Sequence, residues 1–151
     1  MPRPGTYAAL NRLLTTIYRS LPMYLKYACP WTHLGDEKSL DALNHIVEDQ
    51  QQLSTRLADH IITTYGPVDS GDYPLDFPDT HDLAFDYLIG KLLACHKVDV
   101  ASIEACLPTI LDDRVGLALA EEALGSARGH LETLEELAAQ QGRQGISWAK
   151  P

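Results

Sequence analysis

The sequence predicts an all-α protein, a four-helix bundle with a long crossover between the second and third helices. Four segments repeat apolar residues at the period of an amphipathic helix, about 100° per residue. No segment alternates apolar and polar residues as a half-buried strand does. The middle connection, residues 66–80, is long and rich in Gly, Pro, Asp and Ser, which is typical of a crossover along a bundle.

The first predicted helix covers residues 6–28 and should kink at Pro22, because proline removes a backbone donor and crowds the preceding turn. The second is expected from an N-cap at Asp36 to about Tyr65, where Gly66 and Pro67 end it. Its inward stripe is formed by Leu43, Ile46, Val47, Leu53, Leu57 and Ile61.

The third predicted helix begins near Thr80 and ends before Pro108, and the fourth covers residues 112–140. Residues 141–151 show no helical period and are expected to form a C-terminal tail. The chain is thus predicted to contain one bundle domain, residues 1–140, followed by this tail.

Composition narrows the classes of function. The 151 residues carry a net charge of −9 and a pI near 4.9, so the surface should repel the phosphates of nucleic acids and anionic membranes. The three cysteines form no CxxC pair, which favours reduced thiols and a cytoplasmic location. A leader peptide is not expected, because the first residues hold no uninterrupted apolar region, and no apolar run is long enough to span a membrane.

Function in a bundle core comes from polar side chains on the inward faces of the helices. The helical phase places five polar residues on or near those faces, whereas Glu48 falls on the outer face of the second helix. The five are Gln50, Ser54, His96, His130 and Thr133.

The stretch LNRLLTTIYRSLPMYLKYA, residues 10–28, resembles the first helix of ferritin-like proteins of the bacterioferritin and rubrerythrin group. That helix opens L-N-x-L-L, supplies a glutamate ligand three residues later and carries a tyrosine seven residues beyond it. Ile17 stands at the glutamate position. The residues that match the pattern are Leu10, Asn11, Leu13, Leu14 and Tyr24.

The other helices extend the resemblance. QQQLSTRLADHI is similar to E-x-x-H-A-x-R-L-A-x-x-I, which places Gln50 at a glutamate and Leu53 at a histidine. SARGHLETLEEL is similar to D-E-R-x-H-L-x-x-L-E-E-L, with Ala127 at a glutamate and His130 at the retained histidine. The same resemblance places His96 at the position of the glutamate that the family's third helix supplies.

The resemblance implies a ferritin-like bundle, but one whose di-iron site is degenerate. Four carboxylates and two histidines hold the two irons in that family. The four carboxylate positions here are Ile17, Gln50, His96 and Ala127. Neutral groups do not offset two metal charges in a dry core. Ferroxidase or di-iron oxygen chemistry is therefore not expected, nor is an enzyme, and no cofactor is expected.

Two interpretations of the histidine pair stay open. His96 and His130 could bind a single Zn, Cu, Ni or Fe ion, completed by Gln50 or water. Alternatively, they are core histidines hydrogen-bonded to Gln50, Ser54, Thr133 or buried water. The second interpretation is favoured because structural metal sites usually need three or four good ligands.

The leading hypothesis is a non-enzymatic module that acts by self-association, by binding a protein partner or by binding a small ligand. A homodimer is plausible because Tyr18 and Tyr27 fall at the edges of the first helix, and Gly125 and Gly129 would allow close approach of another helix or subunit. The alternative is a metal-binding or redox protein built on His96 and His130.

Overall fold

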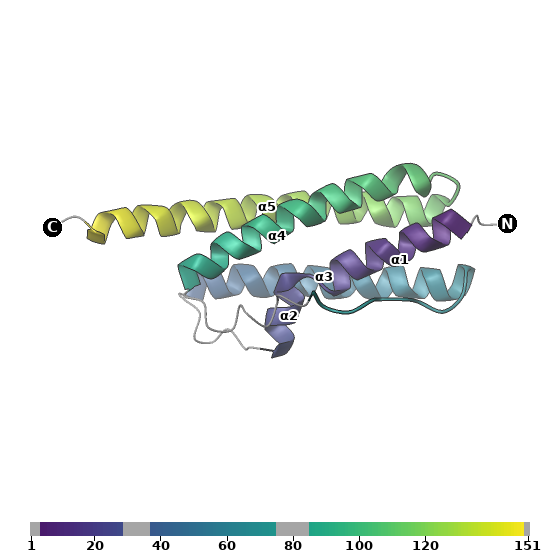
Figure 1. The fold of residues 1–151 in the computed structure, drawn as a ribbon, viewed down its shortest axis with the longest axis horizontal. Helices are drawn as coiled ribbons and strands as arrows, with labels where there is room; N and C mark the ends of the chain where they lie inside the picture. The colour runs from purple at the N-terminus through teal and green to yellow at the C-terminus, as the bar shows by residue number, and fades with distance from the viewer. Residues whose placement is uncertain (1–3, 29–36, 75–84, 150–151) are drawn as a thin grey trace.

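The computed structural model describes residues 4–28, 37–74 and 85–149, and within these ranges it contains helices and no strand (Figure 1). The all-α prediction is confirmed. The elements are α1 (Pro4–Tyr18), α2 (Leu21–Ala28), α3 (Glu37–Thr64), α4 (Phe85–Cys106), the 3₁₀ turn η3 (Leu107–Thr109) and α5 (Arg114–Ala149).

The helices form two antiparallel pairs, α1 with α3 and α4 with α5, while α3 and α4 run in the same direction (Figure 1). The chain must therefore return along the bundle between α3 and α4. The described part of this connection, residues 65–74, lies beside α1. Asp69 donates its backbone N–H to the Asn11 side chain at 3.0 Å, and Arg19 Nε donates to the Gly71 carbonyl at 3.0 Å.

The first predicted helix is in fact two helices, α1 and α2, and the expected kink is a break at residues 19–20. Ser20 caps α2, since its hydroxyl accepts the Met23 backbone N–H at 3.4 Å. Pro22 then lies in the first turn of α2, where a missing N–H costs no helical hydrogen bond. Sequence reasoning identified the residue that disturbs the helix but missed the serine that starts the new one.

The second helix has nearly the predicted bounds, whereas the last helix is longer than predicted. The expected cap Asp36 and the expected start of the third helix at Thr80 lie outside the described residues. Helix α5 continues to Ala149, past the predicted end at residue 140. Glycines interrupt that stretch but no proline does until Pro151, so every backbone N–H needed for the helix is present.

Two apolar cores fill the two halves of the bundle. The first is built from α1, the second half of α3, the end of α4 and the start of α5, and includes Leu10, Leu57 and Ala123. In the second, α2 replaces α1 and packs with the first half of α3, the start of α4 and the later part of α5. The break between α1 and α2 is therefore level with the boundary between the two cores.

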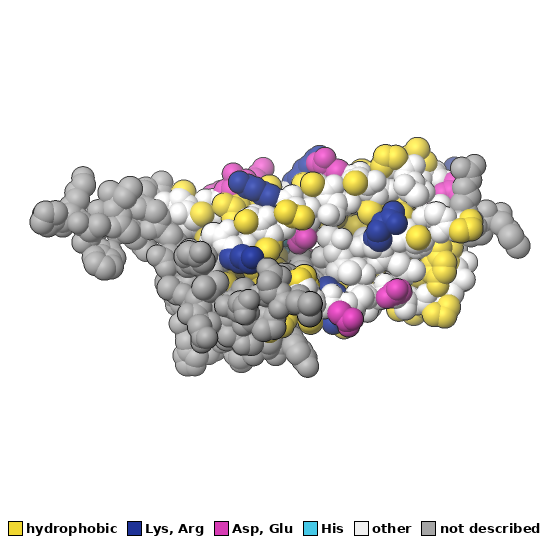
Figure 2. All heavy atoms as spheres, viewed as in Figure 1, with side chains coloured by type: hydrophobic (Ala, Val, Ile, Leu, Met, Phe, Trp, Pro, Cys, Tyr) yellow, Lys and Arg dark blue, Asp and Glu magenta, His cyan; other side chains and the backbone are white. Residues whose placement is uncertain are grey.

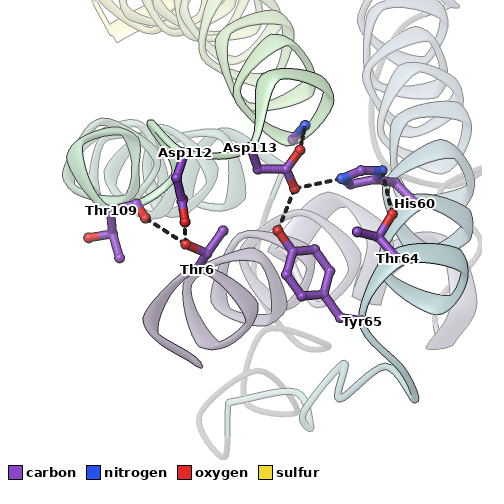
Figure 3. A network of polar contacts seen from close by, with 8 residues as sticks. Thr6, His60, Thr64, Tyr65, Thr109, Asp112 and Asp113 are labelled. Atoms are coloured by element: carbon purple, nitrogen blue, oxygen red, sulfur yellow. Dashed lines mark hydrogen bonds and ion pairs between the residues drawn. The ribbon is translucent and has the colours of Figure 1, made fainter. Parts of the chain in front are cut away.

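A polar network closes the end of the bundle where α3 finishes and α5 begins (Figure 3). Asp113, just before α5, accepts hydrogen bonds from Tyr65 Oη at 2.6 Å, His60 Nε2 at 2.7 Å and the Gly116 backbone N–H at 2.9 Å. Burial opposes ionisation of Asp113, but these three bonds outweigh it and lower its pKa. Beside it, the Thr6 hydroxyl contacts Asp112 Oδ1 at 2.6 Å.

The surface is mixed in character. Figure 2 shows hydrophobic side chains lying between charged ones on the described part of one face. Val98, Leu111 and Val115 are among the exposed apolar residues. Among the described residues, none of the helices has the length and hydropathy required to cross a membrane.

Candidate functional site

A layer of buried polar side chains separates the two apolar cores at the middle of the bundle. The residues come from three helices and from the turn between α1 and α2. Each one faces inward because it falls on the apolar stripe of its helix or, for Ser20, caps a helix that begins there. The layer consists of Ser20, Gln50, Ser54, His96 and His130.

All six positions that the sequence assigned to a ligand set line one small cavity in this layer. The cavity has a volume of about 20 Å³, enough for a single water molecule. Every one of the four main helices contributes to it. The six residues are Ile17, Gln50, Leu53, His96, Ala127 and His130. The structure thus brings together the positions that sequence reasoning grouped.

His96 is buried, at 2% exposure, and makes one hydrogen bond. Its Nε2 donates to the Ala127 carbonyl at 3.0 Å, so that nitrogen carries the proton. Burial and the neighbouring His130 lower the pKa of His96 to about 4, which leaves the ring neutral at physiological pH. Its Nδ1 is then a bare acceptor, and it has no partner among the described residues.

His130 is hydrogen-bonded to Asp49, a partly exposed residue at the edge of the bundle. Its Nε2 donates to Asp49 Oδ2 at 2.8 Å, and the Ser126 hydroxyl lies 3.5 Å from the same nitrogen. The ring centroids of His96 and His130 lie 5.9 Å apart with 62° between the ring planes. The two imidazoles therefore pack edge to face, and each points its Nε2 proton at its own oxygen acceptor.

The three side chains that the sequence suggested as partners of the histidines, Gln50, Ser54 and Thr133, do not bond to them; His96 and His130 bond to the Ala127 carbonyl and to Asp49 instead. Gln50 Oε1 accepts the Ser20 hydroxyl at 2.8 Å, and Thr133 donates to the Gly129 carbonyl within its own helix at 3.2 Å. The Ser54 hydroxyl is buried without a partner.

Sequence reasoning missed Asp99 as part of the cavity wall. Asp99 lies three residues after His96, one turn along the same face of α4. Burial raises its pKa to about 7, so the carboxyl is about half protonated at pH 7 and largely protonated at lower pH. The spacing from His96 was the available signal, but an aspartate on a helix is exposed far more often than buried.

The chemistry available at the cavity is that of a neutral polar pocket. Among the described residues, no three or more His, Cys, Asp or Glu side chains are arranged to hold a metal ion. Gln50 Oε1 and His130 Nε2 are both engaged in hydrogen bonds, and Ile17 and Ala127 offer no donor atom. The donor set does not fit a di-iron centre.

A scan against protein-family models, a search of curated proteins and a search of solved structures each found no match to this chain.

Proposed function

We propose that this chain is a non-enzymatic helical module of ferritin-like type, without a competent di-iron site, that acts by binding a small ligand, a partner or a second copy of itself. The chemistry of the cavity wall carries the proposal. Ile17, Gln50, His96 and Ala127 replace the four carboxylates that the resemblance would require.

Charge supports this proposal. Two divalent irons need about four negative charges nearby, because an uncompensated ion in a dry core costs several kcal/mol. Among the described residues, Asp99 is the acidic side chain that lines the cavity, and Asp49 contacts the cavity residue His130. Asp49 is bound to His130, and Asp99 keeps its proton to about pH 7. Together they supply less than half of the charge required.

The arrangement of the helices supports the ferritin-like part of the proposal. Two antiparallel pairs joined by a connection that returns along the bundle is the topology of ferritin-like proteins. The position of the cavity, between all four main helices, is where such bundles place a metal site.

Aerobic oxidation of Fe(II) tests the proposal. Ferrous iron added to the purified protein is expected to oxidise at the rate seen in buffer alone, and the rate should not change in the variant His130→Ala. Oxidation that is clearly faster with the protein than without it, and slower in His130→Ala, would contradict a non-enzymatic role.

A mononuclear metal site on His96, His130 and Gln50 is the second candidate. One observation favours it: His96 Nδ1 has no partner, and His96 lines a cavity with room for one atom. Against it, a metal ligated by His130 Nε2 would have to displace Asp49. Titration of untagged protein with Zn²⁺, Cu²⁺ or Ni²⁺ in a calorimeter separates the candidates. Heat that saturates in wild type and disappears in His96→Ala would establish the metal site.

A further inference from the structure

A groove of about 740 Å³ lies on the surface between α1, α2, α3 and the described part of the crossover segment, residues 65–74. This volume is within the range of small-molecule sites. Its wall is apolar over much of its extent. The apolar and aromatic residues that line it are Leu14, Tyr18, Met23, Ala58, Val68 and Tyr73.

Arg19, at the break between α1 and α2, is held rigidly at this groove. Its guanidinium carbon lies 4.7 Å from the centroid of the Tyr18 ring and 4.9 Å from that of Tyr73. Its Nε donates to the Gly71 carbonyl. A Cβ at Gly71, whose φ is +64°, would approach Thr15 Cγ2 to 2.9 Å, so glycine lets the segment pass close to α1.

The ring contacts and the hydrogen bond of Arg19 use its faces and its Nε–H, and none of them uses a terminal NH2 group. Asp72 and Asp99 line a neighbouring pocket together with Arg19. Among the described residues, no carboxylate forms an ion pair with it. Lys26, the second cation of the groove, contacts the neutral Asn44 side chain at 3.3 Å. Asp59 is the one acidic side chain among the described residues that line the groove. Positive charge at an apolar groove is notable in a chain with a net charge of −9.

From this geometry we propose that the groove binds a small carboxylic acid with an apolar body. The carboxylate pairs with the terminal NH2 groups of Arg19, and the hydrocarbon lies against Leu14, Met23 and Val68. A planar carboxylate matches the guanidinium fork, and an arginine already fixed by two rings loses little further freedom on binding. The inference rests on the proposed binding role and names the class of small ligand.

Calorimetric titration of the full chain with octanoate and with 1-octanol tests the inference, because the two share a chain length and differ in the head group. Wild type is expected to bind octanoate at least about tenfold more tightly than octanol. Equal affinity for the two, or no octanoate binding, would overturn the inference. This comparison requires no variant, so it holds even if a substitution at Arg19 prevents folding.

Two arginine variants sharpen the test. Arg19→Gln is expected to weaken octanoate binding about tenfold and to change octanol binding less than about twofold. Arg56→Gln removes an exposed arginine that is paired with Glu122 across α3 and α5, and it should bind octanoate as wild type does. An Arg19→Gln protein that folds and binds octanoate with wild-type affinity would overturn the assignment.

The iron experiment tests the proposed function, and the octanoate experiment tests the ligand class, so each proposal can be contradicted without the other. Absence of octanoate binding together with background iron oxidation removes the carboxylate ligand and leaves the non-enzymatic role standing. Rapid iron oxidation contradicts the proposed function whatever octanoate does.

Discussion

The bundle holds two polar clusters, one at its end and one at its middle, and they differ in how fully their atoms are hydrogen-bonded. At the end, Asp113 accepts three hydrogen bonds and fixes the start of α5 against the end of α3 (Figure 3). At the middle, His96 Nδ1 and the Ser54 hydroxyl are buried without partners.

The contrast separates polar groups that stabilise a fold from those that need another explanation. Asp113 and its donors join two helix ends, and none of their buried polar side-chain atoms lacks a hydrogen-bond partner. In the middle layer, two buried polar atoms lack partners among the described residues, and the His96 ring is neutral at physiological pH.

The largest effect is expected from breaking the end cluster. Asp113→Ala removes the N-cap of α5 and leaves the Tyr65 hydroxyl and the His60 Nε2 without their acceptor. It should lower the free energy of unfolding by about 3 kcal/mol. Urea unfolding followed by circular dichroism measures it, with the exposed Asp41→Ala as control. A loss below about 1 kcal/mol would mean that the cluster contributes little.

The pH dependence of stability probes the middle layer, where His96 and Asp99 act in opposite directions. The folded state keeps His96 neutral down to about pH 4, while an ordinary histidine binds a proton below 6.5, so this group makes stability rise with pH between those values. Folded Asp99 keeps its proton to about pH 7, whereas an ordinary aspartate loses it above 3.8. Asp99 therefore makes stability fall as pH rises through that window, and the two contributions largely cancel.

A variant that lacks one of these two groups should show the pH dependence that the other group contributes to stability. Between about pH 4.5 and pH 6.5, the free energy of unfolding of Asp99→Asn should rise by about 2 kcal/mol relative to wild type, and that of His96→Leu should fall by a similar amount. Urea titrations at the two pH values measure both changes. If both variants follow the wild-type pH dependence, then His96 and Asp99 do not have the shifted pKa values described above.

A matched pair of histidine substitutions compares the two clusters directly at neutral pH. His60→Leu deletes a donor to the Asp113 carboxylate and should cost about 1.5 kcal/mol. His96→Leu removes the orphaned Nδ1 together with one hydrogen bond, so the two effects should offset to within about 1 kcal/mol. Chemical unfolding of both variants decides it. A larger cost at His96 than at His60 would reverse the comparison.

The smallest effect is expected at the surface. Arg56 Nη1 and Glu122 Oε1 lie 2.6 Å apart, and both side chains are about half exposed, so solvent and salt screen the pair. Arg56→Gln should leave the urea midpoint unchanged within error. A clear destabilisation would show that this ion pair between α3 and α5 stabilises the bundle as the end cluster does.

Helical periodicity was enough to predict the inward residues of the middle layer. Gln50, His96 and His130 each interrupt an apolar stripe, so helical phase alone placed them on inward faces, and the structure brings all three to one cavity. Asp99 could not be predicted because a carboxylate near the edge of an apolar stripe faces solvent in most helices, and only the packing of neighbouring helices decides whether it is buried.

The end cluster could not be predicted at all. Asp113 lies 53 residues from His60 and 48 from Tyr65 in sequence, and their meeting depends on where α3 ends and α5 begins. The break at Ser20 is a similar case. Ser20 and Pro22 form a plausible start signal, but the continuous apolar stripe of the first segment favoured one helix over two.

The iron content of the protein after loading tests the central claim most directly. Untagged protein incubated anaerobically with excess Fe(II), desalted and analysed for metal is expected to retain far less than one iron per chain, because its cavity offers too few anionic donors. Retention of about two irons per chain would contradict the account, since it would require the di-iron site that Ile17, Gln50, His96 and Ala127 are proposed to have replaced.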